Sequence, residues 1–192
     1  MTRSGPSPVR GSVRTMLAFQ TALGTCGITW SEAGVTGVLL PGTRGLPRRA
    51  RPETPETPET PETPETIREA VAAIVALLDG EHADLRGVVL DESGIDPLRR
   101  SVYAATREIG PGATASYGDI ARAIGKPDAP RAVGHALGEN PFPIVVPCHR
   151  VLSWTGALHG FSAPGGIATK RRMLEIEGAP GFTQLSLLHA AR

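Results

Sequence analysis

Short apolar runs separated by glycine-containing turns fill the first part of the chain. The runs at 16–22, 26–30 and 35–40 each have the length and composition of one β-strand. Residues 31–34, Ser-Glu-Ala-Gly, have the composition of a hairpin turn between the last two runs. This pattern predicts a small β-sheet.

The period of the apolar residues then changes to that of a helix. Apolar side chains recur at helical spacing over 67–78, and Thr66 with Glu69 fits a helix-capping box at its start. Residues 85–90 form another candidate strand. We therefore expect a mixed α/β domain over residues 16–95.

The second half of the chain has the pattern of several helices. An apolar face predicts a helix over 97–109, and a shorter one follows over 116–124, with Ser116 as its N-cap. Another short helix, 131–137, ends at Gly138. Two short helices joined by a tight glycine-containing turn are typical of a helix-turn-helix.

The second helix of this pair has an unusual composition. Arg131 is followed mostly by small side chains, among them Ala132 and Gly134. Such a helix can approach another surface closely, and Arg131 is the one long group at its start. Packing in a core would explain the small residues but not the arginine.

Three segments carry little that could pack in a core. Residues 1–15 hold three arginines and no acid, so we expect a disordered tail, with a basic arm that touches phosphate as the alternative. Residues 52–66 are five Pro-Glu-Thr repeats, whose prolines block helix and sheet and predict a disordered, solvated insertion. An acidic arm that competes with DNA is the alternative here. Residues 181–192 are expected to form a second tail.

Composition and charge narrow the class of protein. With 192 residues, of which 40% are hydrophobic and 20% charged, the chain fits a folded protein of one or two small domains. No apolar run is long enough to span a bilayer and no signal-peptide core follows the start, so we expect a cytoplasmic protein without a membrane partner.

The net charge of +1 hides an asymmetry between the two halves of the chain. Residues 1–96 carry 9 basic and 13 acidic residues, whereas residues 97–192 carry 11 basic and 6 acidic residues. This split hints at a polyanionic partner for the second half.

Residues 143–151, Pro-Ile-Val-Val-Pro-Cys-His-Arg-Val, carry the strongest chemical signal. An apolar run, interpreted as a strand, delivers Cys148 between Pro147 and His149. A thiol with a pKa of about 8.5 is a weak nucleophile at neutral pH unless a base or a positive environment removes its proton. His149 and Arg150 are placed to do so, and simple packing of a buried cysteine is the alternative.

Residues 97–178 resemble the O6-alkylguanine-DNA alkyltransferases, also called methylated-DNA–protein-cysteine methyltransferases. The hallmark of that family is Pro-Cys-His-Arg, which residues 147–150 reproduce. Further matching elements follow one another in the family's order: Ser116-Tyr117-Gly118, Arg131-Ala132-Val133-Gly134, Asn140-Pro141, Gly165-Gly166, Lys170 and Glu177-Gly178. The resemblance implies an α/β (α+β) fold, in which a small mixed α/β domain precedes a helical, winged helix-turn-helix-like DNA-binding and catalytic domain over residues 96–180.

The resemblance also implies the reaction. Cys148 would take an alkyl group, such as methyl, from O6 of guanine in DNA, irreversibly and once per molecule. His149 would help to deprotonate Cys148 through a water, and Glu177 would support the histidine, with Glu175 as a nearby competitor. Asn140 would brace the turn between the recognition helix and the cysteine.

The partner implied is double-stranded DNA that contains O6-alkylguanine, bound by a monomer. The target carbon lies inside the stacked duplex, so the base must be flipped out. Arg131 would fill the gap in the stack, and Tyr117 would push the neighbouring phosphate and bond the extruded base. Ala132 and Gly134 would let the helix enter the narrow minor groove, and Arg150 would also contact the DNA.

The substrate pocket would be lined by Tyr117, Val151, Phe161 and Ser162. We expect no cofactor and no metal, because Cys26 and a distant His82 do not make a zinc site. Cys26 is interpreted as a buried small hydrophobe, Trp30 and Trp154 as packing residues, and the run 170–172 as a solvated helix face.

Three other functions compete with repair. A lesion-binding relative that repairs nothing would lack the cysteine, so Cys148 argues against it. A helix-turn-helix regulator should carry several base-reading side chains, whereas this recognition helix carries essentially Arg131. A thiol protease would need a remote histidine with an asparagine or aspartate, and no oxyanion-hole signature supports one.

Overall fold

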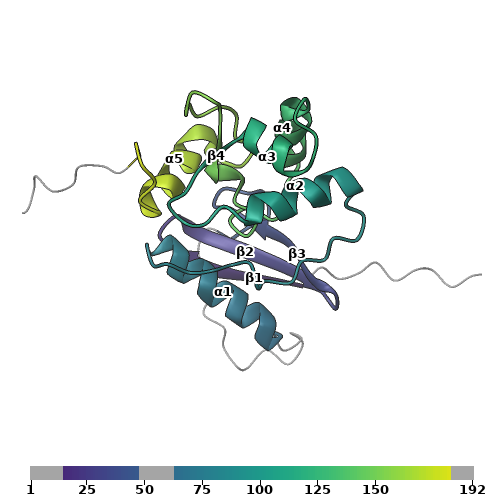
Figure 1. Cartoon of the computed structure of the whole chain (residues 1–192). Helices are drawn as coiled ribbons and strands as arrows, with labels where there is room; N and C mark the ends of the chain where they lie inside the picture. Colours follow the sequence, from purple (N-terminus) through teal and green to yellow (C-terminus); the bar gives the residue numbers. More distant parts are fainter. Residues whose placement is uncertain (1–14, 48–62, 183–192) are drawn as a thin grey trace, which may run out of the picture.

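The computed structural model describes residues 15–47 and 63–182. Three strands, β1 (Thr15–Thr21), β2 (Gly24–Ser31) and β3 (Gly34–Leu39), form an antiparallel sheet in that order. They confirm the three predicted runs and the hairpin turn before Gly34. Helix α1 lies below this sheet in Figure 1, and helices α2 to α5 lie above it.

Helix α1 (Glu65–Leu78) ends where its apolar pattern predicts but starts two residues early. The expected capping box of Thr66 and Glu69 is wrong, because the N-cap is Pro64 and no side chain caps the helix. Instead, Arg68 pairs with Glu65 at 2.5 Å. The last Pro-Glu-Thr repeat therefore enters the helix, and the expectations for residues 52–62 lie outside the described residues.

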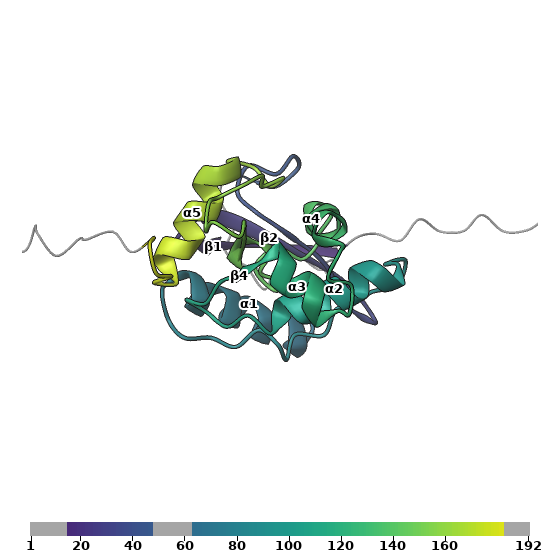
Figure 2. The same cartoon turned by 45° about the horizontal axis from the view of Figure 1, so that its top comes forward.

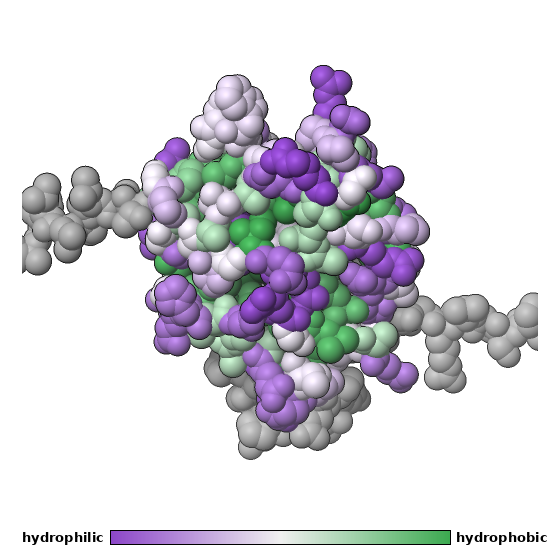
Figure 3. Space-filling view, in the orientation of Figure 1, coloured by the Kyte–Doolittle hydropathy of each residue, from purple (hydrophilic) through white to green (hydrophobic). Residues whose placement is uncertain are grey.

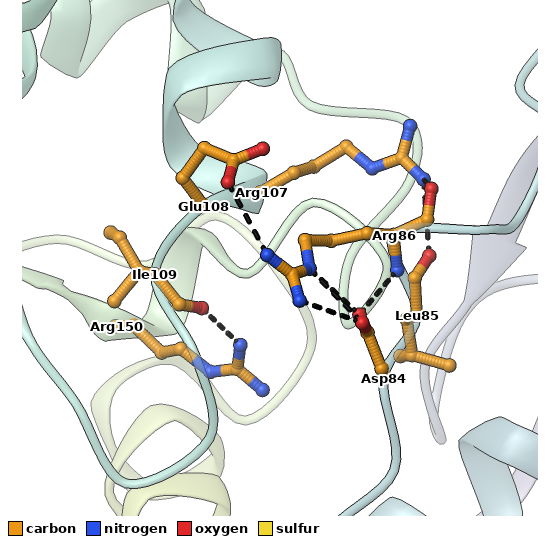
Figure 4. A network of polar contacts seen from close by, with 7 residues as sticks. All are labelled: Asp84, Leu85, Arg86, Arg107, Glu108, Ile109 and Arg150. Atoms are coloured by element: carbon orange, nitrogen blue, oxygen red, sulfur yellow. Dashed lines mark hydrogen bonds and ion pairs between the residues drawn. The ribbon is translucent and has the colours of Figure 1, made fainter.

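The predicted strand over 85–90 is also wrong. This segment is a loop, which touches the sheet through a single bridge between Leu90 and Val35. Its backbone carbonyls are taken by a side chain, because the Arg107 guanidinium donates to the carbonyls of Leu85 and Arg86 (Figure 4) and of Val88, at 2.7–3.0 Å. Carbonyls bonded in this way are not available for a strand ladder.

Three helices form the helix-turn-helix unit and its support. They are α2 (Pro97–Arg107), α3 (Tyr117–Ala123) and α4 (Pro130–Gly138). Ser116 caps α3, as the sequence predicts, and it forms a capping box with Asp119. Two-residue strands β4 (Ala115–Ser116) and β5 (Val151–Leu152) pair in parallel, and α5 (Gly166–Ile176) completes the fold.

One continuous core joins the sheet to the helices. Tyr103 of α2 is fully buried in this core, and its hydroxyl donates to the carbonyl of Ala136 in α4 at 3.0 Å. Its ring meets Phe142 edge to face, with the centroids 6.2 Å apart. Tyr103 thus fixes the recognition helix to the body of the protein. Among the described helices, none has both the length and the apolar character needed to cross a membrane.

We predict that Tyr103→Phe lowers the free energy of unfolding by about 1–3 kcal/mol, because it leaves the buried Ala136 carbonyl without its donor. Ser101→Ala, on the exposed side of the same helix, should change it by less than about 0.5 kcal/mol. Urea denaturation of both variants measures the difference. Equal effects would show that the buried hydroxyl has no special role.

Candidate active site

Cys148 lies at the start of a short 3-10 helix, η1 (Cys148–Arg150), and not on a strand. The expected strand is absent because Pro143 and Pro147 have no N–H for a ladder, and the chain between them makes a tight turn. Ile144 adopts a φ of +75° in this turn, a conformation that a β-branched residue rarely takes. The strained residue lies four positions before Cys148, in the turn that leads to it.

Asn140 holds this turn closed from both sides. Its amide nitrogen donates to the carbonyl of Val146 at 2.9 Å, and its side-chain oxygen accepts the N–H of Phe142 at 2.9 Å. These two bonds tie the end of α4 to the residues just before Cys148. The geometry agrees with the bracing role expected for Asn140.

Behind Cys148, a carboxylate links the two residues that follow it. Glu177 accepts from His149 Nε2 at 2.9 Å and from Arg150 Nε and Nη2 at 2.8 Å each. The side chains of His149 and Glu177 are both fully buried. Glu175 takes no part in this cluster and lies 3.7 Å from Arg172 instead, so the geometry favours Glu177 over its competitor.

The environment sets the protonation of these groups. Burial would raise the pKa of the Glu177 carboxyl, but the hydrogen bond from His149 and the pairing with Arg150 outweigh it and hold this pKa at about 2. Burial lowers the pKa of the His149 imidazole, against the opposing effect of Glu177. A neutral imidazole that gives its Nε2 hydrogen to an ionised carboxylate keeps a lone pair on Nδ1. That buried Nδ1 has no hydrogen-bond partner among the described residues.

The Cys148 thiol is likewise shifted by its surroundings. Burial raises its pKa, while the Asn140 amide and the positive charge of Lys170 act in the opposite sense. From the sequence, residues 170–172 are interpreted as a solvated helix face, and for Lys170 this is wrong. Lys170 is 1% exposed, and its ammonium donates to the carbonyl of Val151 at 2.7 Å. The resting site therefore pairs a thiol with a neutral base, under the influence of a buried cation.

Cys148 is 8% exposed and lines two cavities. One, of about 440 Å³, lies between the helix-turn-helix and the loop before α5, and it is lined by Tyr117, Gly134, Leu137, Gly138, Cys148, His159, Gly160, Phe161 and Ser162. The other, of about 640 Å³, reaches towards β3 and the loop at 43–45. The Ser162 hydroxyl closes the loop onto α4 by donating to the carbonyl of Gly138 at 2.9 Å. The sulfur can therefore be reached from outside.

Arg131 is exposed at the start of α4 and has no ion-pair or hydrogen-bond partner within the part of the chain described. Ala132 and Gly134 lie on the same helix, and a Cβ at Gly134 would be 3.8 Å from the ring of Tyr117. Tyr117, half-buried at the start of α3, thus stands between the recognition helix and Cys148.

Two expected site residues lie elsewhere. Arg150 is buried on Glu177 and donates to the carbonyl of Ile109 (Figure 4), so its guanidinium is not free to contact DNA. Val151 is fully buried and does not line either cavity at Cys148.

The burial of Lys170 beside the site was not predicted from the sequence, although this lysine is part of the motif that matches the family. His159, which precedes the expected pocket residues Phe161 and Ser162, also lines the smaller cavity.

A helix-turn-helix unit that carries a reachable cysteine next to a buried histidine base defines a class: DNA-binding proteins with a nucleophilic thiol. Comparison with known proteins is more specific. Residues 97–179 match the family model described as 6-O-methylguanine DNA methyltransferase, DNA binding domain. A methylated-DNA–protein-cysteine methyltransferase of Methanothermobacter thermautotrophicus is 34% identical over 153 residues, which are 79% of this chain and 78% of that relative.

Solved structures agree. The Mycobacterium tuberculosis O6-methylguanine methyltransferase has a TM-score of 0.66 at 32% identity, over 86% of this chain and 94% of that one. A structure of the OGT protein from the same organism in complex with DNA has a TM-score of 0.65 at 34% identity, over 87% and 96% of the two chains. The chain belongs to the methylated-DNA–protein-cysteine methyltransferase family.

We predict that Glu177→Gln lowers the free energy of unfolding by about 3–5 kcal/mol at neutral pH, because it leaves Arg150 buried without its counter-charge. The folded-state pKa of about 2 lies below the ordinary 4.5, so this contribution is present above pH 4.5 and is lost as the pH falls towards 2. The shift corresponds to about 3 kcal/mol. Denaturation curves at several pH values measure it.

The matched control is Glu175→Gln, which changes a carboxylate on the same turn of chain with only a long contact to Arg172. Its effect should stay below about 1 kcal/mol. The interpretation of Glu177 would be wrong if the two variants lost equal stability, or if the Glu177 variant kept the acid sensitivity of the parent.

We further predict that Lys170→Met slows alkylation of Cys148 by iodoacetamide near neutral pH. Removing the cation takes away an effect that lowers the Cys148 pKa, so the midpoint of the rate against pH should move upward. Arg172→Met, on the exposed side of α5, should leave the midpoint unchanged. An unchanged midpoint in the Lys170 variant would rule out an electrostatic role for this residue.

Proposed function

We propose that this protein repairs O6-alkylguanine in double-stranded DNA by transferring the alkyl group to Cys148. The observation that carries the proposal is the arrangement of a reachable Cys148 directly before His149, whose imidazole is held by the buried Glu177 carboxylate. The similarity to a protein solved in complex with DNA supports DNA as the partner.

The chemistry follows from the protonation states of the site. The lone pair on His149 Nδ1 accepts the thiol proton, directly or through a bridging water, and Glu177 stabilises the imidazolium that results. The thiolate sulfur forms a bond to the alkyl carbon while the bond from that carbon to O6 breaks. The bonding electrons go to the guanine, which takes up one proton and is restored. A thioether is left on Cys148, and because it has no easy hydrolysis route, each molecule acts once.

The helix-turn-helix supplies access to the base. A guanine stacked in a duplex cannot reach the sulfur of Cys148, a residue that is only 8% exposed, so the nucleotide has to leave the stack and enter the cavity of about 440 Å³. Arg131, exposed and unpaired in the described structure, is the group we assign to the vacated space. The small size of Ala132 and Gly134 lets the backbone of α4 come close enough to the DNA to enter the minor groove. We assign Tyr117 to the extruded nucleotide, because it lines the cavity.

The loop before α5 completes the pocket in this proposal. Phe161 and Ser162 line both cavities at Cys148, and the hydrogen bond from Ser162 to Gly138 keeps the loop on α4. The aromatic ring of Phe161 gives the base an apolar surface. Arg150 and Val151 support the site from behind, through Glu177 and Lys170.

We expect a duplex with one O6-methylguanine to add one methyl group per protein, on Cys148, with no second turnover. Intact-mass and peptide mass spectrometry measure this. Cys148→Ala should abolish transfer and spare DNA binding, whereas Cys26→Ala should transfer normally because Cys26 is buried in the sheet. Tight lesion binding without any methyl on the protein would favour a binding-only function instead.

Arg131→Ala should slow repair of the duplex at least about tenfold and leave transfer from free O6-methylguanine base unchanged, since the free base needs no flipping. Single-turnover rates on the two substrates provide the comparison. An equal loss on both substrates would contradict the flipping role assigned to Arg131.

A further inference from the structure

Trp154 is the most exposed large hydrophobic residue in the described structure, at 90% exposure. The expectation that it packs in the fold is therefore wrong. An indole in water is unfavourable for a folded protein, and Trp is among the residue types most enriched where a partner binds. The exposure of Trp154 therefore indicates that a binding partner covers this side chain.

The turn that carries Trp154 is well ordered by hydrogen bonds. The N–H of Ser153 donates to the carbonyl of Ala157 at 3.2 Å, and the N–H of Gly156 donates back to the carbonyl of Ser153 at 2.9 Å. The Ser153 hydroxyl accepts the N–H of Ala157 at 3.0 Å and contacts the Thr155 hydroxyl at 2.8 Å. The backbone that presents the indole is thus fixed before any partner binds, which reduces the entropy lost on binding.

The register of the small parallel sheet places this turn beside the start of α3. Ser116 pairs with Leu152, and both chains leave the sheet at this point, one into α3 at Tyr117 and the other into the turn at Ser153. The turn then continues into residues 159–162, which line the cavity at Cys148. The turn that carries Trp154 therefore begins beside the start of the helix that carries Tyr117 and leads along the chain to the residues that line the proposed nucleotide pocket.

The views of the whole molecule agree with this placement. The loop that follows β5 rises on the same side as α3 and α4 in Figure 1, and it comes forward with them in Figure 2. In Figure 3 two groups of side chains stand out from this side with a hollow between them, and strongly hydrophilic residues lie below the hollow and to its right. A duplex seated on α4 would meet this loop as well.

The chemistry around the turn favours a nucleic acid over an apolar partner. Gly156 and Ala157 share a cavity of about 620 Å³ with Arg171, an exposed cation on α5. A flat aromatic face beside a positive charge suits a nucleotide, because the face can stack on a base while the cation attracts the phosphate backbone.

We propose that Trp154 is a DNA contact that stacks on a nucleotide of the strand from which the guanine is extruded, beside the phosphate assigned to Tyr117. This inference rests on the proposed repair function. Since every base has an aromatic face, the contact adds affinity without sequence preference and helps to hold the distorted strand while Cys148 reacts.

Fluorescence can follow this contact directly, because the chain has only two tryptophans. Trp30→Phe protein keeps Trp154 as its one tryptophan, and Trp154→Phe protein keeps Trp30. Titration of the Trp30→Phe protein with a duplex that contains O6-methylguanine should quench the emission of Trp154 by about half or more. The emission that remains should be less sensitive to quenching by acrylamide, because the DNA covers the indole. The Trp154→Phe protein should respond little, because Trp30 lies in the sheet.

Trp154→Ala should weaken duplex binding about tenfold, the loss of one base–aromatic stack, and leave transfer from free O6-methylguanine base unchanged. Methyl transfer to Cys148 is measured on the same samples. If transfer proceeds normally while Trp154 shows neither quenching nor an affinity loss, the stacking role is refuted and the repair function stands. If no methyl reaches Cys148, the repair function itself fails.

Discussion

The site depends on one buried carboxylate. Glu177 is fully buried, and an ionised group in that position is costly unless charges and hydrogen bonds surround it. His149 and Arg150 supply them, and both follow Cys148 directly in the chain. The same interaction therefore fixes the 3-10 helix to the end of α5 and sets which nitrogen of His149 can accept a proton. Arg150 extends the link to Ile109, just beyond α2.

The cysteine is positioned by the recognition helix as much as by the base. Asn140 ties the end of α4 to the strained turn before Cys148, and Ser162 ties the pocket loop to Gly138 at the end of the same helix. The helix that we propose to dock on DNA thus also forms a wall of the chemical pocket. In this account DNA binding and alkyl transfer share one rigid group of contacts, which lets the energy of docking be used to hold the base near the sulfur.

Local sequence signals predicted those parts of the fold that local physics decides. The strand runs, the N-cap at Ser116 and the short helices with Arg131 were found because alternation, caps and prolines act over a few residues. The strand over 85–90 failed because a distant side chain, Arg107, takes its carbonyls. Motif similarity identified the family and pointed to Glu177, but it could not show that Arg150 is buried. The burial of Lys170 and the exposure of Trp154 were equally invisible, because burial depends on tertiary packing.

The central claim is that His149 rests as a neutral base with its hydrogen on Nε2, towards Glu177. Long-range nitrogen–proton NMR correlation of ¹⁵N-labelled protein measures this tautomer directly. We expect the Nε2–H tautomer at pH 7, unchanged as the pH falls below 6.5, the ordinary pKa of histidine, because burial opposes protonation. In Glu177→Gln protein the preference should weaken. An Nδ1–H tautomer or an imidazolium at pH 7 in the parent protein would leave Cys148 without its base and contradict the account.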